Sequence, residues 1–152
     1  MRKPFVLLLA VLVALLSVGA YTAVGAAGNE LTVKLDGTIV NFDGAKPYFD
    51  TTTGRIMAPV SFASEKLGAK VEGDGSSAAE IKSGTDSIKL KVGESKAMVN
   101  GVEKLMDCKP VVKDANLYVS LRYMAQWLGV RVGWSQETNT VVLNTLRNTT
   151  GK

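Results

Sequence analysis

The residues that could carry acid–base chemistry are six carboxylates in predicted turns or beside predicted strands: Asp36, Asp43, Glu72, Asp74, Asp107 and Asp114. Two carboxyl groups held roughly 5–10 Å apart in a cleft can hydrolyse a glycosidic bond. Acids at strand ends and in turns are solvated by default, and a domain of short hairpins offers little cleft to hold them. We therefore expect solvated charges here, with a small glycan-active enzyme as the alternative.

Histidine is absent and cysteine occurs once among the 152 residues. The lack of histidine excludes a Ser-His-Asp triad, a Cys-His pair, a three-histidine metal site and an imidazole acid–base catalyst. A single cysteine excludes an internal disulfide framework, a cysteine-rich zinc site and a cysteine-ligated iron–sulfur cluster. We expect Cys108 to be a small buried side chain at the end of a strand; a reactive thiol or an intermolecular bridge are the alternatives. We expect no cofactor and no metal.

Aromatic side chains and one arginine form a second group with binding chemistry. Trp134, Tyr123, Trp127 and Tyr118 could together form a platform on which a glycan stacks. We expect Trp134 to pack in the core or between the two copies. Trp127 should lie partly off the buried face of a helix, where an exposed indole marks a binding surface. The candidate interaction surface comprises Trp127, Tyr123 and Arg122.

Residues 1–27 have the pattern of an export signal. Arg2 and Lys3 precede an uninterrupted apolar run over residues 5–16, and small residues follow it. The run is shorter than the roughly 20 residues that a membrane-spanning helix needs. We expect cleavage after Ala26 or Ala27, with an uncleaved anchor as the alternative. The protein is therefore predicted to be secreted or associated with the cell envelope.

The charge of the remaining chain is nearly balanced. Setting aside residues 1–27, which hold Arg2 and Lys3, lowers the net charge from +4 to +2. Acidic and basic residues are interspersed, without the stripe of lysine and arginine that marks a nucleic-acid binder. We expect no nucleic-acid partner, and no membrane contact after signal cleavage.

The chain after the signal is predicted to consist of two copies of one unit. Residues 55–74 align with residues 116–135 at an offset of 61, and the shared positions include Leu67 with Leu128 and Gly68 with Gly129. The predicted domain covers residues 28–146, with repeats at about 31–92 and 93–146. A polar tail follows at residues 147–152.

Each copy is predicted to form a β-hairpin, a loop, a short helix and a second hairpin. Asp36-Gly37 and Asn100-Gly101 supply the two-residue turns of the first hairpins. This pattern gives an α+β fold of two pseudo-repeats, with an antiparallel sheet wrapped on two short helices.

Both helices are predicted to span about nine to eleven residues, from their apolar periodicity. Pro59 is expected in the first turn of the first helix, and Ser120 as the cap of the second. Gly68 and Gly129 follow the helices at positions that suit a left-handed residue, and should end them.

The double pattern resembles the copper amine oxidase N-terminal-like domain, a stalk domain found in secreted and cell-surface proteins of Gram-positive bacteria. The family motif V-P-L-R-x-[IF]-A-E-x-L-G-A-x-V-x-W-D is matched by residues 118–134 and more loosely by residues 56–71. The departures are Ser120 where the family has Pro, Ser61 where it has Arg, and Gly73 where it has Trp. The first copy is therefore the less faithful one.

The resemblance implies a small non-catalytic module whose role is a cell-envelope or protein interaction, without amine oxidase activity. In the oxidases the copper ligands and the quinone lie in a separate catalytic domain. Arg122 matches an arginine of the family motif. It either grips a carboxylate or sugar, or braces the helix against the sheet through an ion pair or a bond to a backbone carbonyl, and we favour the brace. Partners left open are an envelope polymer, another protein, or a second copy bound through a sheet edge or apolar patch. An inert spacer is a further alternative.

Overall fold

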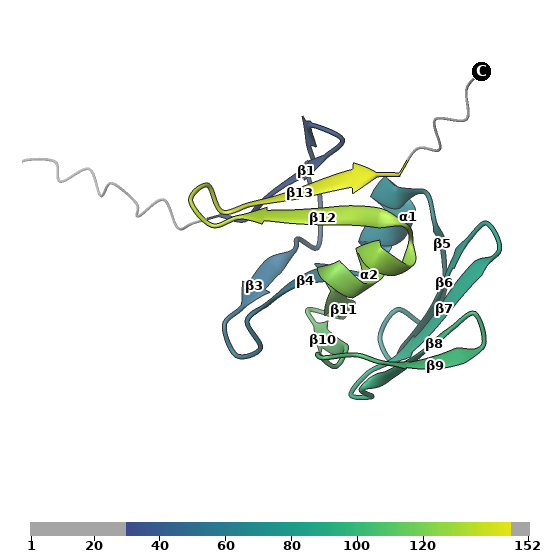
Figure 1. Ribbon diagram of the computed structural model, residues 1–152. Helices are drawn as coiled ribbons and strands as arrows, with labels where there is room; N and C mark the ends of the chain where they lie inside the picture. Colours follow the sequence, from purple (N-terminus) through teal and green to yellow (C-terminus); the bar gives the residue numbers. More distant parts are fainter. Residues whose placement is uncertain (1–29, 147–152) are drawn as a thin grey trace, which may run out of the picture. The chain divides into compact units, whose positions relative to one another are not determined.

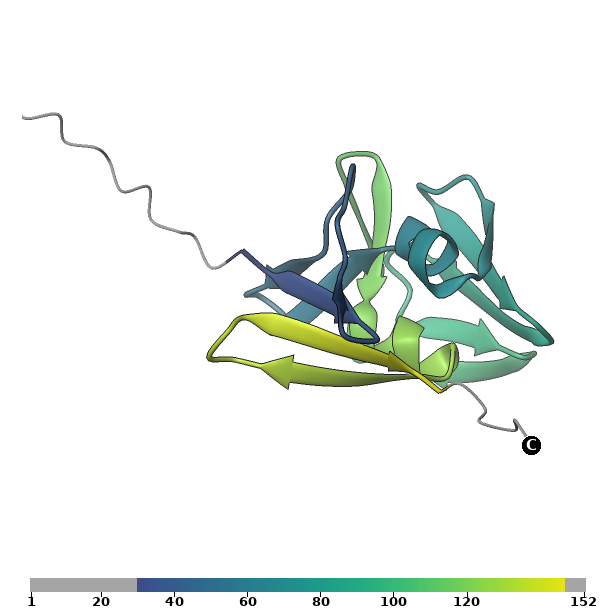
Figure 2. The same ribbon diagram turned by 90° about the horizontal axis from the view of Figure 1, so that it is seen from above.

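The computed structural model describes residues 30–146, so the predicted signal and the polar tail lie outside the described residues. Within this range the chain forms thirteen strands and two helices, which bears out the α+β class. Figures 1 and 2 show both helices lying among three small sheets instead of under one continuous sheet. The single wrapped sheet expected from the sequence is therefore wrong in its detail.

Sheet A joins the two ends of the described chain. Its strands, in spatial order, are β12 (Val130–Ser135), β13 (Thr140–Thr145), β1 (Thr32–Leu35) and β2 (Thr38–Ile39). β1 runs beside β13 and parallel to it, with Val33 opposite Val141 (Figure 1). This pair corrects the expectation of a wholly antiparallel architecture. Hairpin signals report only strands that are close in sequence, whereas β1 and β13 meet because the fold closes on itself.

Sheet B is formed by the central hairpin of each predicted repeat. It has the order β10 (Val111–Lys113), β11 (Asn116–Ser120), β4 (Arg55–Pro59) and β3 (Tyr48–Asp50). β4 and β11 are antiparallel, and Ala58 lies opposite Val119, the position 61 residues further on. Equivalent positions therefore face each other across a local pseudo-twofold axis. This register is the one that a duplicated unit requires, although the duplication itself stays a prediction.

Sheet C also combines hairpins from both predicted repeats. Its order is β5 (Lys70–Gly73), β6 (Ala78–Ser83), β7 (Asp86–Lys91), β8 (Lys96–Val99) and β9 (Val102–Leu105). The turn between β8 and β9 is Asn100-Gly101, with φ of 53° and 77°, as predicted for a two-residue hairpin. Asp36 and Gly37, at 49° and 86°, confirm the turn of the β1–β2 hairpin in the same way.

The helices are shorter than predicted. α1 (Ser61–Leu67) and α2 (Leu121–Trp127) have seven residues each. They start late because the residues before them are still paired in sheet B: the Val60 N–H donates to the Leu117 carbonyl over 2.8 Å, and Ser120 lies opposite Met57. Pro59 consequently ends β4 and is not in the first turn of α1. Ser120 stands at the N-cap of α2, but the structure shows no cap bond from its side chain.

The helix ends follow the prediction. Gly68 (φ 71°) caps α1 in the left-handed conformation, and the Ala69 N–H donates to the Ala63 carbonyl over 3.0 Å. Gly129 (φ 70°) follows α2 and is also left-handed. A residue with a Cβ is strained at such an angle, which explains glycine at both positions.

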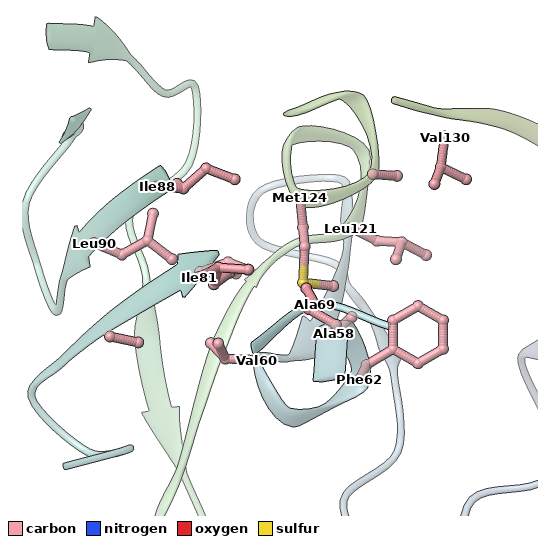
Figure 3. Close-up of a cluster of buried hydrophobic side chains, with 14 of the residues drawn as sticks. Ala58, Val60, Phe62, Ala69, Ile81, Ile88, Leu90, Leu121, Met124 and Val130 are labelled. Atoms are coloured by element: carbon pink, nitrogen blue, oxygen red, sulfur yellow. The ribbon is translucent and has the colours of Figure 1, made fainter. Parts of the chain in front are cut away.

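One apolar core joins both helices and all three sheets. Figure 3 shows Ile88 and Ile81 of sheet C pointing toward Met124 of α2, with Phe62 of α1 on the other side. Strand periodicity sets this burial, because Ile81, Ile88 and Leu90 are buried while Glu80 and Lys89 face outward. The helix faces predicted from periodicity are confirmed, since Ala63, Leu121, Met124 and Ala125 are all buried.

Candidate binding surfaces

The predicted interaction residues lie together on α2. The rings of Tyr123 and Trp127, one helical turn apart, pack with centroids 5.3 Å apart at a tilt of 37°. Both are half-buried against the main core, and the backbone N–H of Asp107 donates to the Tyr123 hydroxyl over 3.3 Å. The pair is therefore only partly open to solvent and does not form a flat, fully exposed platform.

Arg122 lies on the exposed side of α2. Among residues 30–146 the structure shows no ion pair or hydrogen bond from its guanidinium, so the favoured brace between helix and sheet is not formed there. A long-range ion pair is made by Arg55 of β4, whose Nε and Nη2 each lie 2.6 Å from Asp107 Oδ2 in the loop between β9 and β10. Arg122 is thus left facing solvent beside Tyr123.

Trp134 corrects the prediction of a core residue, because 43% of it is exposed. It pairs with Val141 and shares the core-facing side of sheet A with Val132 and Leu143. Its place near the end of the β12–β13 hairpin explains the exposure, since the pairing ends at the next pair, Ser135 with Thr140. Strand alternation therefore places the Trp134 indole on the core-facing side of sheet A, but the apolar core does not extend as far along the hairpin as Trp134.

The carboxylates predicted to be solvated have more defined partners. Asp36 accepts hydrogen bonds from the Thr145 N–H at 2.8 Å and the Thr145 hydroxyl at 2.7 Å, which ties the first hairpin to the last strand. Asp74 accepts from the N–H groups of Ser76, Ser77 and Ala78 and from the Ser77 hydroxyl. These contacts hold the pKa of Asp74 below its ordinary value. Asp36, Asp74 and Asp107 are therefore structural acceptors.

The outward face of sheet C forms an open trough of about 500 Å³. Direct pairing places one residue from each strand in a row across it, and the row runs Glu72, Glu80, Lys89, Met98, Glu103. Lysines pair with the acids: Lys82 Nζ lies 2.7 Å from Glu72 and 3.6 Å from Glu80 and so bridges them, and Lys96 Nζ lies 2.6 Å from Glu103. We call this surface the sheet C trough.

The acids of the trough are held in their charged form. Hydrogen bonds and charge from Lys70 and Lys82 lower the pKa of Glu72 to about 2. A hydrogen bond from the Ser87 hydroxyl is the main reason that the pKa of Glu80 is lowered. A general acid needs the opposite shift, so these carboxylates are suited to ion pairing and not to proton donation.

We expect the stabilisation from Glu72 to disappear in acid. Because its folded pKa of about 2 lies below the ordinary value of 4.5, this contribution is complete above pH 4.5 and is lost as the pH falls toward 2. Urea unfolding of the wild type and Glu72→Gln should differ at pH 7 and converge near pH 2. Glu65→Gln, which removes a carboxylate from the exposed side of α1, is the control and should change the free energy of unfolding by less than about 0.5 kcal/mol at pH 7. A gap for Glu72→Gln that persists at pH 2 would contradict this assignment.

Cys108 is buried, as predicted, but it lies in the loop between β9 and β10 and not at a strand end. Its Sγ is 3.6 Å from Met57 Sδ, and both pack with Tyr118 on the side of sheet B that faces away from the main core. Burial raises the pKa of the Cys108 thiol. The thiol is therefore a packing group with little thiolate at neutral pH.

Two further findings concern the described residues as a whole. No helix within residues 30–146 is long and apolar enough to cross a membrane. The same residues contain no group of three His, Cys, Asp or Glu side chains placed to hold a metal ion.

Comparison with known protein families gives one match. Residues 34–143, which include most of all three sheets and both helices, match the copper amine oxidase N-terminal domain. The chain belongs to this family. The N-terminal domain of copper amine oxidases is non-catalytic by itself. Neither the curated proteins nor the solved structures gave a match.

Copper does not fit this copper amine oxidase N-terminal domain. Copper(II) sites in proteins are built largely from imidazole nitrogen, and the sequence has no histidine. The described residues also lack a cluster of other ligands that could replace it. Copper chemistry therefore cannot be inferred for this chain from the name of its family.

The structure explains one departure from the family motif. Gly73 stands where the motif has the tryptophan represented by Trp134 in the second copy. Its φ is +127°, and a Cβ there would lie 2.6 Å from the Ala78 carbonyl oxygen. The first copy cannot accept a tryptophan at this position without moving the β5–β6 hairpin.

Proposed function

We propose that this chain is a non-catalytic, exported binding module that contacts a polymer or a protein of the cell envelope. The observation that carries the proposal is the family match over residues 34–143, to a domain that is non-catalytic by itself. The export pattern of residues 1–27 supports the location. The stalk domains that the sequence resembles occur in secreted and cell-surface proteins of Gram-positive bacteria, so their cell wall is the first target to test.

The charges of the domain favour binding over turnover. The ion-paired Glu72 and Glu80 have pKa values below their ordinary values, and Asp107 is engaged by Arg55. A glycan-active enzyme needs one carboxylic acid that stays protonated near neutral pH. The small envelope enzyme is therefore the weaker candidate.

Self-association through β9 is a weaker alternative. All four residues of this edge strand are exposed. In a dimer, the β9 strands of two copies would pair antiparallel about a twofold axis perpendicular to the sheet. The residue at the centre of that pairing would then lie directly opposite the same residue of the second copy. In β9 that residue is Glu103 or Lys104, and like charges directly opposite each other destabilise a pair.

We expect purified Gram-positive cell walls to retain the protein (residues 28–152) in a sedimentation assay. Trp127→Ala should reduce the retained fraction several-fold, because it removes the larger ring of the α2 surface. Trp134→Ala is the matched control: it removes the more exposed tryptophan from a different element and should leave retention unchanged.

Each other outcome has a defined meaning. Absence of wild-type retention would contradict the wall-polymer form of the proposal. Retention that Trp127→Ala leaves unchanged would keep the function and reject the α2 surface. Circular dichroism of both variants checks that a loss of binding is not a loss of folding.

A further inference from the structure

A second pocket lies on sheet B, on the side that faces away from the main core. Its volume is about 410 Å³, at the small end of the roughly 300–1,000 Å³ typical of ligand pockets. We call it the tyrosine pocket. It is lined by the loop of residues 44–48 and by four residues of the β10–β11 hairpin: Lys113, Asp114, Asn116 and Tyr118.

Tyr118 is the fixed element of this pocket. Only 4% of it is exposed, and its ring packs on Met57 and Cys108 and meets the Tyr48 ring edge-on, with centroids 5.2 Å apart at 66°. The structure gives its hydroxyl no hydrogen bond to any residue between 30 and 146. No side-chain nitrogen or oxygen among these residues is both buried and without a partner, so the Tyr118 hydroxyl is open to the solvent of the pocket. It can therefore donate a hydrogen bond to a ligand that enters there.

The charges around the pocket favour an anion. Lys113 Nζ lies 4.2 Å from the centroid of the Tyr48 ring, which holds this ammonium at the pocket. Lys46 also lines the pocket, and Asp114 is its one acid. Burial, followed by the charge of Asp114, raises the pKa of Tyr118, so the phenol remains a hydrogen-bond donor at neutral pH.

We propose that the tyrosine pocket binds a carboxylate-bearing sugar unit of an envelope polysaccharide. The Tyr118 hydroxyl and the Lys113 ammonium are suited to the carboxylate, and the exposed part of the half-buried Tyr48 ring is suited to the apolar face of the sugar. Capture of a peptide C-terminus, the competing source of a carboxylate, typically relies on a nest of backbone N–H groups. Here the donors are side chains on paired strands. This inference rests on the proposed function, because it names the ligand class of the same binding module.

The test is a calorimetric titration of the protein with three probes: a trimer of galacturonic acid, the neutral galactose trimer, and a short peptide with a free C-terminal carboxylate. We expect the acidic trimer to bind and the other two to bind at least tenfold more weakly. Tyr118→Phe keeps the ring in place and should weaken binding of the acidic trimer roughly tenfold or more, the usual effect of losing a hydrogen bond to a charged group. Lys113→Gln should weaken it as well.

Two matched controls keep the test specific. Thr138→Val removes a hydroxyl from the turn between β12 and β13, and Lys91→Gln removes an ammonium from sheet C; both should leave the dissociation constant unchanged. The inference is overturned if the acidic trimer does not bind, if the neutral trimer or the peptide binds equally well, or if Tyr118→Phe has no effect. Cell walls that retain Tyr118→Phe as well as the wild type would reject the pocket while leaving the proposed function intact.

Discussion

Neither half of this domain is expected to fold alone. Residues 28–92 and 93–152, expressed separately, should each lack a cooperative unfolding transition, and an equimolar mixture should regain the circular dichroism of the whole chain. All three sheets join strands from both halves, through the pairs β1–β13, β4–β11 and β7–β8. Cutting the chain therefore removes a partner strand from every sheet.

The contacts between the halves are specific as well as numerous. Asp36 bonds Thr145, and Arg55 bonds Asp107. A chain of about 60 residues buries only about 60% of its unfolded surface, which leaves little margin once the shared core is lost. Thermal unfolding of each half and of the mixture is the measurement. A cooperative transition from either half alone would contradict this account of the core.

Phe62→Ala should lower the free energy of unfolding by about 3–5 kcal/mol. Phe62 is 1% exposed at the start of α1, and its ring lies 5.7 Å from that of Phe42. Removing it leaves a cavity where α1 meets the core, and that loss is a large share of the roughly 5–15 kcal/mol that stabilises a typical domain.

Phe49→Ala is the matched control for this substitution. Phe49 lies on β3 and is 48% exposed, so its loss should cost less than about 1 kcal/mol. Urea unfolding of both variants compares them directly. Similar costs for the two would show that Phe62 does not hold α1 as described.

Local features of the fold were predictable because each depends on residues close in sequence. The Asp36-Gly37 and Asn100-Gly101 turns need positive φ at two successive positions, which few residue pairs tolerate. Gly68 and Gly129 end the helices for the same conformational reason. Periodicity identified the buried helix faces, since a helix must bury one stripe of apolar side chains.

Features that depend on distant residues were missed. The parallel pairing of β1 with β13 has no hairpin signal, and the bond from Thr145 to Asp36 spans 109 positions. The strand alternation that placed Trp134 on the core side carries no information on where the core ends. Pro59 was assigned to the first turn of α1 because its pairing across sheet B is not visible in that segment alone.

The two candidate binding surfaces also differ in whether residues close in sequence could predict them. The α2 residues Arg122, Tyr123 and Trp127 could be grouped from helical spacing, and their role as a binding surface stays a prediction. The tyrosine pocket was not predicted, because Tyr48 comes from one predicted repeat and Lys113 and Tyr118 from the other. The two Lys-Pro loops at the same place in each copy were the one local signal near it.

The most direct test of the central claim follows binding and turnover in one experiment. Protein (residues 28–152) is incubated with purified Gram-positive cell walls, and the retained protein and the soluble sugar released are measured over time. A binding module predicts saturable retention with no sugar release above that of walls alone. Sugar release that rises with protein concentration would contradict the non-catalytic assignment, and a lack of retention would contradict binding to the wall.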